Sequence, residues 1–182
     1  PEGFTELKDG LFDGCLNLTN VSLPDTLTKI GSSVFMWCPK LTDIDIPDSV
    51  TIIGGQAFQE TGLEHIVFPS QLKTIEGSAF SMCKKLRSLT IPKSVETIGD
   101  SAFWQCNALT ELTIPGTLGK MGEYVFYGCQ GIKTLTIEEG IEEISAHAFD
   151  CCALLESISL PNSLRRIDED AFPSCSNLKN MV

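Results

Sequence analysis

One aromatic residue returns at near-constant spacing along the whole chain. The intervals between its eight occurrences are 23, 23, 22, 23, 23, 23 and 23 residues, and the positions are Phe12, Phe35, Phe58, Phe80, Phe103, Phe126, Phe149 and Phe172. A fixed period of this length is typical of a solenoid, in which each unit buries its apolar side chains only against its neighbours. The 182 residues are therefore expected to form a stack of eight coils.

Each coil is expected to begin at a proline, with one exception. We number the coils 1 to 8 by their first residues, which are Pro1, Pro24, Pro47, Pro69, Pro92, Pro115, Glu138 and Pro161. Aligned in this way, the repeat reads P-x-x-[LV]-x-x-I-G-x-x-A-F-x-x-C-x-x-L-x-x-[LI]-x-I. Since Pro1 is already in phase with the later repeats, we expect residues 1–182 to be a single solenoid domain that belongs to a longer protein.

The residues before each proline alternate between apolar and polar, as in Leu112-Thr113-Ile114. This alternation predicts a short strand with one buried face, and strands from successive coils would pair in parallel. Apolar residues three and six positions after the proline, such as Val95 and Ile98, favour a second short strand or a turn. The Ala-Phe segment is expected to form one helical or 3₁₀ turn.

Two small residues of the repeat have expected roles. The alanine that precedes the phenylalanine in five coils (Ala57, Ala79, Ala102, Ala148 and Ala171) is expected to leave room for the phenylalanine of the adjacent coil. The recurring glycine suits a corner with positive φ, and it occupies Gly31, Gly54, Gly99 and Gly122.

This pattern resembles the BspA-like leucine-rich repeat, whose period is about 23 and whose recurring words are I-P-x-S-V-x-x-I-G-x-x-A-F-x-x-C. Residues 91–106 carry all of them, as I-P-K-S-V-E-T-I-G-D-S-A-F-W-Q-C. The departures are a third coil one residue short, Glu138 in place of proline and Thr61 in place of cysteine. The resemblance implies an α/β repeat fold, a curved leucine-rich-repeat solenoid with a parallel sheet on its concave face and short strands, turns or 3₁₀/helical turns on its convex side.

Seven of the eight cysteines share one repeat position, three residues after the phenylalanine: Cys15, Cys38, Cys83, Cys106, Cys129, Cys152 and Cys175. We interpret them as a ladder of small buried side chains. Disulfides between neighbouring coils and a metal site are the alternatives. Zinc ligands, however, usually come in pairs two to four residues apart. Cys151 is out of register and is expected to be exposed.

The charge balance argues against several classes of partner. The chain has 13 basic and 24 acidic residues and a net charge of −11. Binding of nucleic acid needs clustered Lys and Arg to neutralise phosphates, and none is present, so no nucleic-acid partner is expected. No apolar stretch approaches the roughly 20 residues of a membrane-spanning helix. No phosphate loop, metal-binding His pair or cofactor motif appears, so no cofactor is expected.

The outward-facing side chains of the pre-proline strands form the first candidate binding surface. They include Asp43, Asp45, His65, Ser88, Thr90, Glu111 and Thr113, and the candidate surface also takes in Glu64 and Arg87 beside them. Many of the outward positions are Ser or Thr, which also fits a merely solvated sheet face. Asp43, His65 and Ser88 follow the order of a hydrolase triad, but a flat sheet offers no oxyanion hole. We therefore expect a hydrogen-bonded polar patch and no catalytic residue.

An aromatic ridge is the second candidate surface. Trp37, Trp104 and Tyr127 occur one or two residues after a phenylalanine. Exposed along one ridge, they would suit a protein interface or a platform for sugar rings. Partial packing between coils is the alternative.

The function expected from these observations is a non-enzymatic module that binds a protein, including host or matrix proteins. The resemblance further implies a secreted or cell-surface protein of bacteria or protists with a role in adhesion. A structural spacer and a glycan-binding module remain the alternatives. The terminal coils are also expected to associate end to end, because they lack a polar cap.

Overall fold

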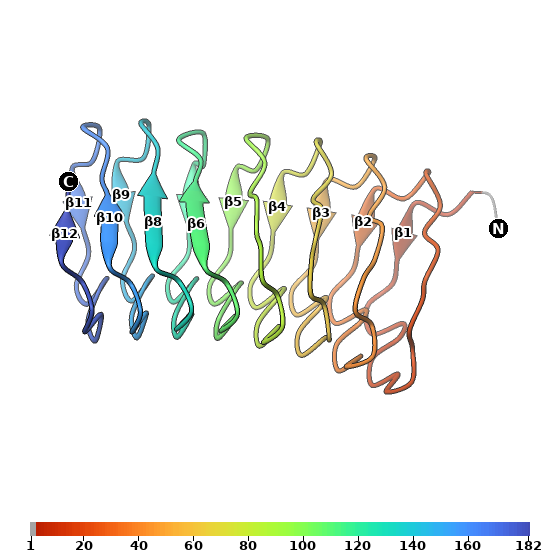
Figure 1. Ribbon diagram of the computed structural model, residues 1–182. Coiled ribbons are helices and arrows are strands. Elements are labelled where there is room, and N and C mark those ends of the chain that lie inside the picture. The colour runs from red at the N-terminus through yellow and green to blue at the C-terminus, as the bar shows by residue number, and fades with distance from the viewer. Residues whose placement is uncertain (1–2) are drawn as a thin grey trace.

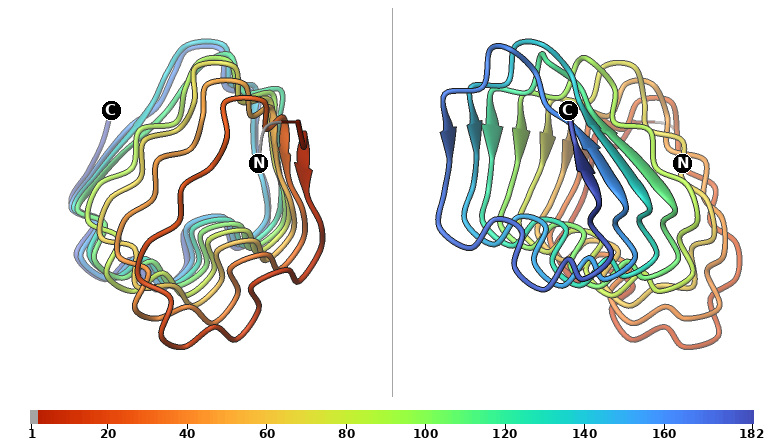
Figure 2. Two further views of the ribbon diagram at one scale, coloured as in Figure 1. Left: turned by 90° about the vertical axis from the view of Figure 1, so that its right-hand side faces the viewer. Right: turned by 60° about the vertical axis from the view of Figure 1, so that its left-hand side comes forward.

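A computed structural model describes residues 3–182, and it shows the coils stacked along one axis from end to end (Figures 1 and 2). The phenylalanine spine runs through every coil. Successive rings stack with centroids 5.0–5.5 Å apart and planes within 3–21° of parallel. Six of the rings are fully buried, and Phe12 and Phe172 in the end coils are partly buried. The predicted spine of inward-facing rings is therefore confirmed.

Short strands five and six residues after each coil start form the post-proline ladder. Six of them make one parallel sheet: β1 (Glu6–Leu7), β2 (Lys29–Ile30), β3 (Ile52–Ile53), β4 (Thr74–Ile75), β5 (Thr97–Ile98) and β7 (Lys120–Met121). β9 (Glu143–Ile144) and β11 (Arg166–Ile167) pair separately. The sequence favoured a second short strand or a turn here, and the strand is what forms.

The pre-proline ladder is shorter than predicted. It contains β6 (Glu111–Ile114), β8 (Thr134–Ile137), β10 (Ser157–Ser159) and β12 (Asn180–Met181), all parallel and in the order β12-β10-β8-β6. The prediction of a strand before each proline is thus correct for coils 5–8 and wrong for coils 1–4.

Coil 3 differs from the other coils in its length and in its core. Its missing residue falls between Thr61 and Leu63, before the segment that should form the strand, and residues 65–68 keep the exposed-buried alternation of Glu111–Ile114. Phe68 also puts a large ring into the core, edge-on to Phe80 at 5.4 Å and to Phe103 at 6.5 Å.

The segment around each phenylalanine forms turns, and residues 3–182 contain neither an α-helix nor a 3₁₀-helix. The expected helical turns, and with them the α part of the predicted α/β class, are not confirmed. No described element is a long apolar helix of the kind that crosses a membrane.

Left-handed residues explain why no helix forms here. In every coil the residues two before and two after the phenylalanine have positive φ, for example Ser78 (57°) and Met82 (59°). Such residues cannot continue a right-handed helix. Instead, alternate N–H groups point to the next coil: Ser78 donates to Asp100 O at 2.9 Å and Phe80 to Ala102 O at 2.8 Å.

The recurring glycine has a different role from the one predicted. Gly31, Gly54, Gly99 and Gly122 do not have positive φ. A Cβ on Gly99 would lie 2.5 Å from the backbone N of Gly77, and one on Gly122 would lie 2.5 Å from the backbone N of Asp100. Glycine is required because the backbones of neighbouring coils touch at this corner.

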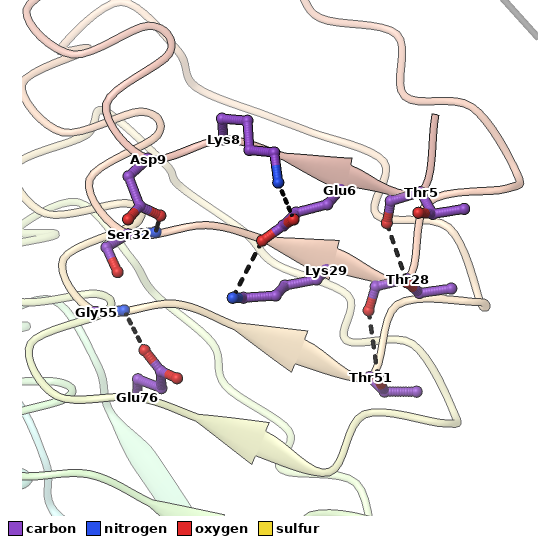
Figure 3. Close-up of polar contacts among 10 residues, drawn as sticks. All are labelled: Thr5, Glu6, Lys8, Asp9, Thr28, Lys29, Ser32, Thr51, Gly55 and Glu76. Atoms are coloured by element: carbon purple, nitrogen blue, oxygen red, sulfur yellow. Dashed lines mark hydrogen bonds and ion pairs between the residues drawn. The ribbon is translucent and has the colours of Figure 1, made fainter. Parts of the chain in front are cut away.

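Side chains add polar bonds between coils, as Figure 3 shows for coils 1–4. The hydroxyl of Thr28 donates to Thr5 O at 3.0 Å, one coil earlier. Acidic side chains accept backbone N–H groups in the same way: Asp9 Oδ1 accepts from Ser32 N at 2.8 Å, and Glu76 Oε2 accepts from Gly55 N at 2.9 Å. Glu76 stands where other coils have glycine, which shows how that position tolerates a longer side chain.

The cysteines form the predicted ladder. All eight are free thiols, so the disulfide alternative is wrong. Six thiols donate to the carbonyl of the phenylalanine one coil earlier, at 3.1–3.5 Å: Cys38, Cys83, Cys106, Cys129, Cys152 and Cys175. Cys151, expected to be exposed, is half-buried with its Sγ 3.9 Å from the hydroxyl of Tyr127.

Candidate functional site

The outward side chains of the pre-proline segments, here called the pre-proline face, lie at the surface as predicted. Asp43, Asp45, His65, Arg87, Ser88, Thr90, Glu111 and Thr113 are exposed, and Glu64 is half-buried. Val67 interrupts the polar columns with 81% of its surface exposed.

The structure brings five of these predicted residues together around one groove. The groove lies between coils 4 and 5 and has a volume of about 500 Å³. The predicted residues that line it are Arg87, Ser88, Thr90, Glu111 and Thr113. Lys93 and Glu138 also line it and were not predicted, although the exceptional residue at the start of coil 7 marked Glu138 in the sequence.

Ion pairs cross the coil boundaries on both sides of this groove. Arg87 Nη2 lies 3.7 Å from Glu64 Oε2, and Lys93 Nζ lies 3.7 Å from Glu138 Oε2. Glu138 Oε2 also accepts the backbone N–H of Gly116 at 3.3 Å. The side chain that replaces proline at the start of coil 7 therefore contacts the starts of both preceding coils.

A smaller hollow of about 140 Å³ lies between coils 2 and 3 and is lined by Asp43, Asp45 and His65. The expected polar patch is only partly formed there. His65 Nδ1 lies 3.4 Å from Ser88 Oγ, but within residues 3–182 no hydrogen bond joins His65 to Asp43. A Ser-His-Asp mechanism requires the acid to orient the histidine, and this arrangement does not provide that contact.

The predicted aromatic ridge divides into two separate parts. Trp37 is 49% exposed, and its Nε1 donates to Glu60 Oε1 at 3.0 Å. Trp104 and Tyr127 are half-buried and stack on each other, with centroids 6.0 Å apart. The described residues show no ring contact between Trp37 and this pair.

Sequence reasoning missed two members of the second part. Tyr124 lies 5.9 Å from Tyr127, and the ring of His147 stacks on that of Tyr124 at 4.5 Å. The signal was available, because Tyr124 and His147 are 23 residues apart and share the position two before the phenylalanine.

A second groove marks a break in the post-proline ladder between coils 6 and 7. It has a volume of about 470 Å³, with Lys120 and Met121 on one wall and Glu142, Glu143 and Ser145 on the other. At every other described boundary, the backbone N–H at the repeat position of Ser145 donates to the carbonyl at the repeat position of Met121, one coil earlier. Here the hydroxyl of Ser145 donates to Met121 O instead, at 2.6 Å.

Comparison with known sequences gives a match over the whole chain. The sequence profile described as the BspA type leucine rich repeat region matches residues 1–110 and 96–182, with six copies. No curated protein matches the chain.

Three solved structures are similar to this chain. A leucine-rich repeat protein of T. pallidum is 25% identical with a TM-score of 0.67, and the match covers 96% of this chain and 72% of that one. A leucine rich cell surface protein of Faecalibacterium prausnitzii is 29% identical with a TM-score of 0.57, covering 97% and 62%. A leucine-rich repeat protein of Eubacterium ventriosum is 19% identical with a TM-score of 0.57, covering 100% and 71%, and that likeness concerns the fold alone.

Proposed function

The chain belongs to the BspA-type leucine-rich repeat family, and we propose that it is a non-enzymatic module that binds a protein through its pre-proline face. The observation that carries this proposal is the groove between coils 4 and 5, where charged and hydroxyl side chains surround a volume of about 500 Å³. Polar groups around a concave surface fix the orientation of a bound partner, and charge complementarity speeds the encounter.

A location at the cell surface is part of the same proposal. One similar structure, 29% identical, is that of a leucine rich cell surface protein. A net charge of −11 keeps an elongated molecule soluble and favours partners with basic surfaces. Adhesion to a host or matrix protein is the role we propose for this module.

The test compares three forms of the chain as bait for proteins from host extracellular extract. The first is the unchanged chain. The second carries Asp43→Ala, Asp45→Ala, Arg87→Ala and Glu111→Ala on the pre-proline face. The control carries Lys73→Ala and Glu96→Ala, an exposed ion pair with a 2.8 Å separation on the post-proline ladder.

We expect quantitative mass spectrometry to find proteins retained by the unchanged chain and by the control but lost from the face variant. The same set of proteins on all three baits would contradict binding through this face. Retention of no protein by any bait would favour the alternative in which the chain is a structural spacer.

A glycan-binding role is the second candidate, and the stack of Trp104, Tyr127, Tyr124 and His147 supports it. Aromatic rings that are partly exposed to solvent can make contacts to sugar rings. On a glycan array, this role predicts binding that Trp104→Ala abolishes and that Glu111→Ala leaves unchanged. Equal binding by the two variants would rule out the aromatic stack as the site.

A further inference from the structure

The edge strand of the pre-proline ladder has a free side that faces coil 4. β6 pairs with β8 and with no other described strand. On the β8 side, Thr110 O accepts from Lys133 N at 2.9 Å and Ile114 O accepts from Glu138 N at 3.0 Å. Since successive residues of a strand in a parallel ladder turn their backbone groups to opposite neighbours, Glu111 and Thr113 direct theirs toward coil 4.

Those backbone groups have no partner on coil 4. The segment of coil 4 that lies opposite, residues 88–91, is not a strand. Within residues 3–182, no backbone hydrogen bond joins it to Glu111 or Thr113. The groove of about 500 Å³ lies along this boundary and is lined by both segments. A row of unpaired N–H and C=O groups at a sheet edge is a template for another strand.

The charged side chains that line the groove are Arg87, Lys93, Glu111 and Glu138, two of each sign. Arg87 is paired with Glu64, and Lys93 is paired with Glu138. Glu111 is exposed and has no ion-pair partner among the described residues. The net charge of −11 adds a long-range attraction for cations. A basic segment therefore complements the groove better than an acidic one.

We propose that this groove binds an extended, basic peptide segment of the partner, which lies along β6 and bonds to the backbone of Glu111 and Thr113. Addition of a strand to an exposed sheet edge is a recurring mode of peptide recognition, in which the main chain provides affinity and side chains provide specificity. The inference rests on the proposed function and narrows its partner to one chemical class.

The probe is a labelled synthetic peptide, acetyl-Lys-Val-Thr-Val-Thr-Lys-amide, and its acidic counterpart has Glu at both ends. Thr113→Pro removes the backbone N–H that faces the groove. It leaves the hydrogen bonds between β6 and β8, because the backbone N–H and C=O of residue 113 point away from β8. Proline is tolerated at a sheet edge. Thr113→Val is the matched control, since it keeps the N–H and removes only the side-chain hydroxyl.

By fluorescence anisotropy at low salt, we expect the basic peptide to bind the unchanged chain and Thr113→Val alike. We expect affinity to fall about tenfold in Thr113→Pro and the acidic peptide to bind more weakly than the basic one. Equal affinity for Thr113→Pro and the unchanged chain would overturn the proposed edge pairing, and so would absence of binding to the unchanged chain.

Hydrogen exchange of the unchanged chain provides a second readout that does not depend on the proline variant folding. The amides of Glu111 and Thr113 should exchange fast alone and become protected when the basic peptide is bound. Unchanged exchange at both amides under saturating peptide would also overturn the inference. Loss of host proteins from the face variant, without any peptide binding, would leave the proposed function standing and this inference refuted.

Discussion

At the scale of single residues, the cysteine of each coil acts as a small apolar side chain with one weak donor. Cys38, Cys83, Cys106, Cys129 and Cys152 are fully buried, and each thiol reaches the carbonyl of the phenylalanine one coil earlier. The 23-residue spacing predicted this ladder, because it sets the sulfurs in a line. It could not predict the carbonyl acceptor, which depends on how the turn after each phenylalanine orients its peptide groups.

Burial gives these thiols a measurable effect on the pH dependence of stability. It raises the pKa of Cys83 and Cys129 to about 12, whereas an unfolded cysteine has a pKa of about 8.5. The folded state therefore favours the neutral thiol. This contribution is complete below the unfolded pKa and is lost as the pH rises from about 8.5 toward 12, by about 1.4 kcal/mol per pH unit for each thiol.

We predict that urea unfolding at pH 7, 9 and 10 will show a falling free energy of unfolding above pH 9. The double variant Cys83→Ala/Cys129→Ala should show a shallower fall, because two of the thiols that titrate on unfolding are gone. Identical slopes for the two proteins would show that these thiols do not ionise on unfolding.

The corner glycine supports a second prediction at this scale. Gly99→Ala would place a Cβ 2.5 Å from the backbone N of Gly77, so the two coils must move apart, at a cost of roughly 1–3 kcal/mol. Gly77→Ala is the control, because the nearest atom to its Cβ is Asp100 O at 3.3 Å. Chemical denaturation should show the larger loss for Gly99→Ala, and an equal loss would argue against close backbone contact at this corner.

At the scale of elements, the spine and the two ladders differ in how well the sequence predicts them. The spine follows from period alone, since every coil supplies one ring in the same phase. The ladders depend on the separation of neighbouring backbones, which a repeat pattern does not specify. The 22-residue third coil was visible in the sequence, but the length of a coil does not show whether its backbone lies close enough to the next coil to pair with it.

The site shows the same division between what could and could not be predicted. Side-chain alternation identified which residues of the pre-proline segments face solvent, and the residues named for this face are exposed in the structure, apart from the half-buried Glu64. The groove between coils 4 and 5 could not be predicted, because it exists where one ladder ends. Trp37 and Trp104 were grouped by their proximity to a phenylalanine, but they occupy different repeat positions, two and one residues after it.

A prediction for the spine concerns an interior ring. Phe80 is fully buried between Phe58 at 5.0 Å and Phe103 at 5.4 Å. We expect Phe80→Ala to lower the free energy of unfolding by roughly 3–5 kcal/mol. Phe172→Ala should cost less, because that ring is only partly buried and stacks on one side alone. Urea denaturation compares the two, and a smaller loss for Phe80→Ala would contradict a continuous spine.

A prediction for the ladders concerns the boundary between coils 6 and 7. Ser145 Oγ donates to Met121 O at 2.6 Å and replaces a backbone bond of the regular ladder. Ser145→Ala removes this donor at a cost of about 1 kcal/mol. Hydrogen exchange should become faster in β7 and β9 and remain unchanged in β3. Unchanged exchange in all three strands would show that the hydroxyl does not hold the boundary.

At the scale of the whole molecule, the interruptions of the two ladders fall at different places. The post-proline ladder joins coils 1–6 and then coils 7 and 8, whereas the pre-proline ladder joins coils 5–8. Every boundary between successive coils is therefore crossed by at least one ladder and by one pair of stacked phenylalanines. Stability in such an array is approximately a sum over neighbouring coils, and the molecule remains continuous although neither ladder is complete.

The continuous stack of phenylalanines is the central claim, because it places every outward side chain in its column. Nuclear Overhauser contacts between phenylalanine rings, measured on protein with selectively labelled phenylalanine, test it most directly. Centroid distances of 5.0–5.5 Å predict contacts between each ring and those 22 or 23 residues away, with ring shifts far from random-coil values. Ring signals with random-coil shifts and no contacts between rings of different coils would contradict the account.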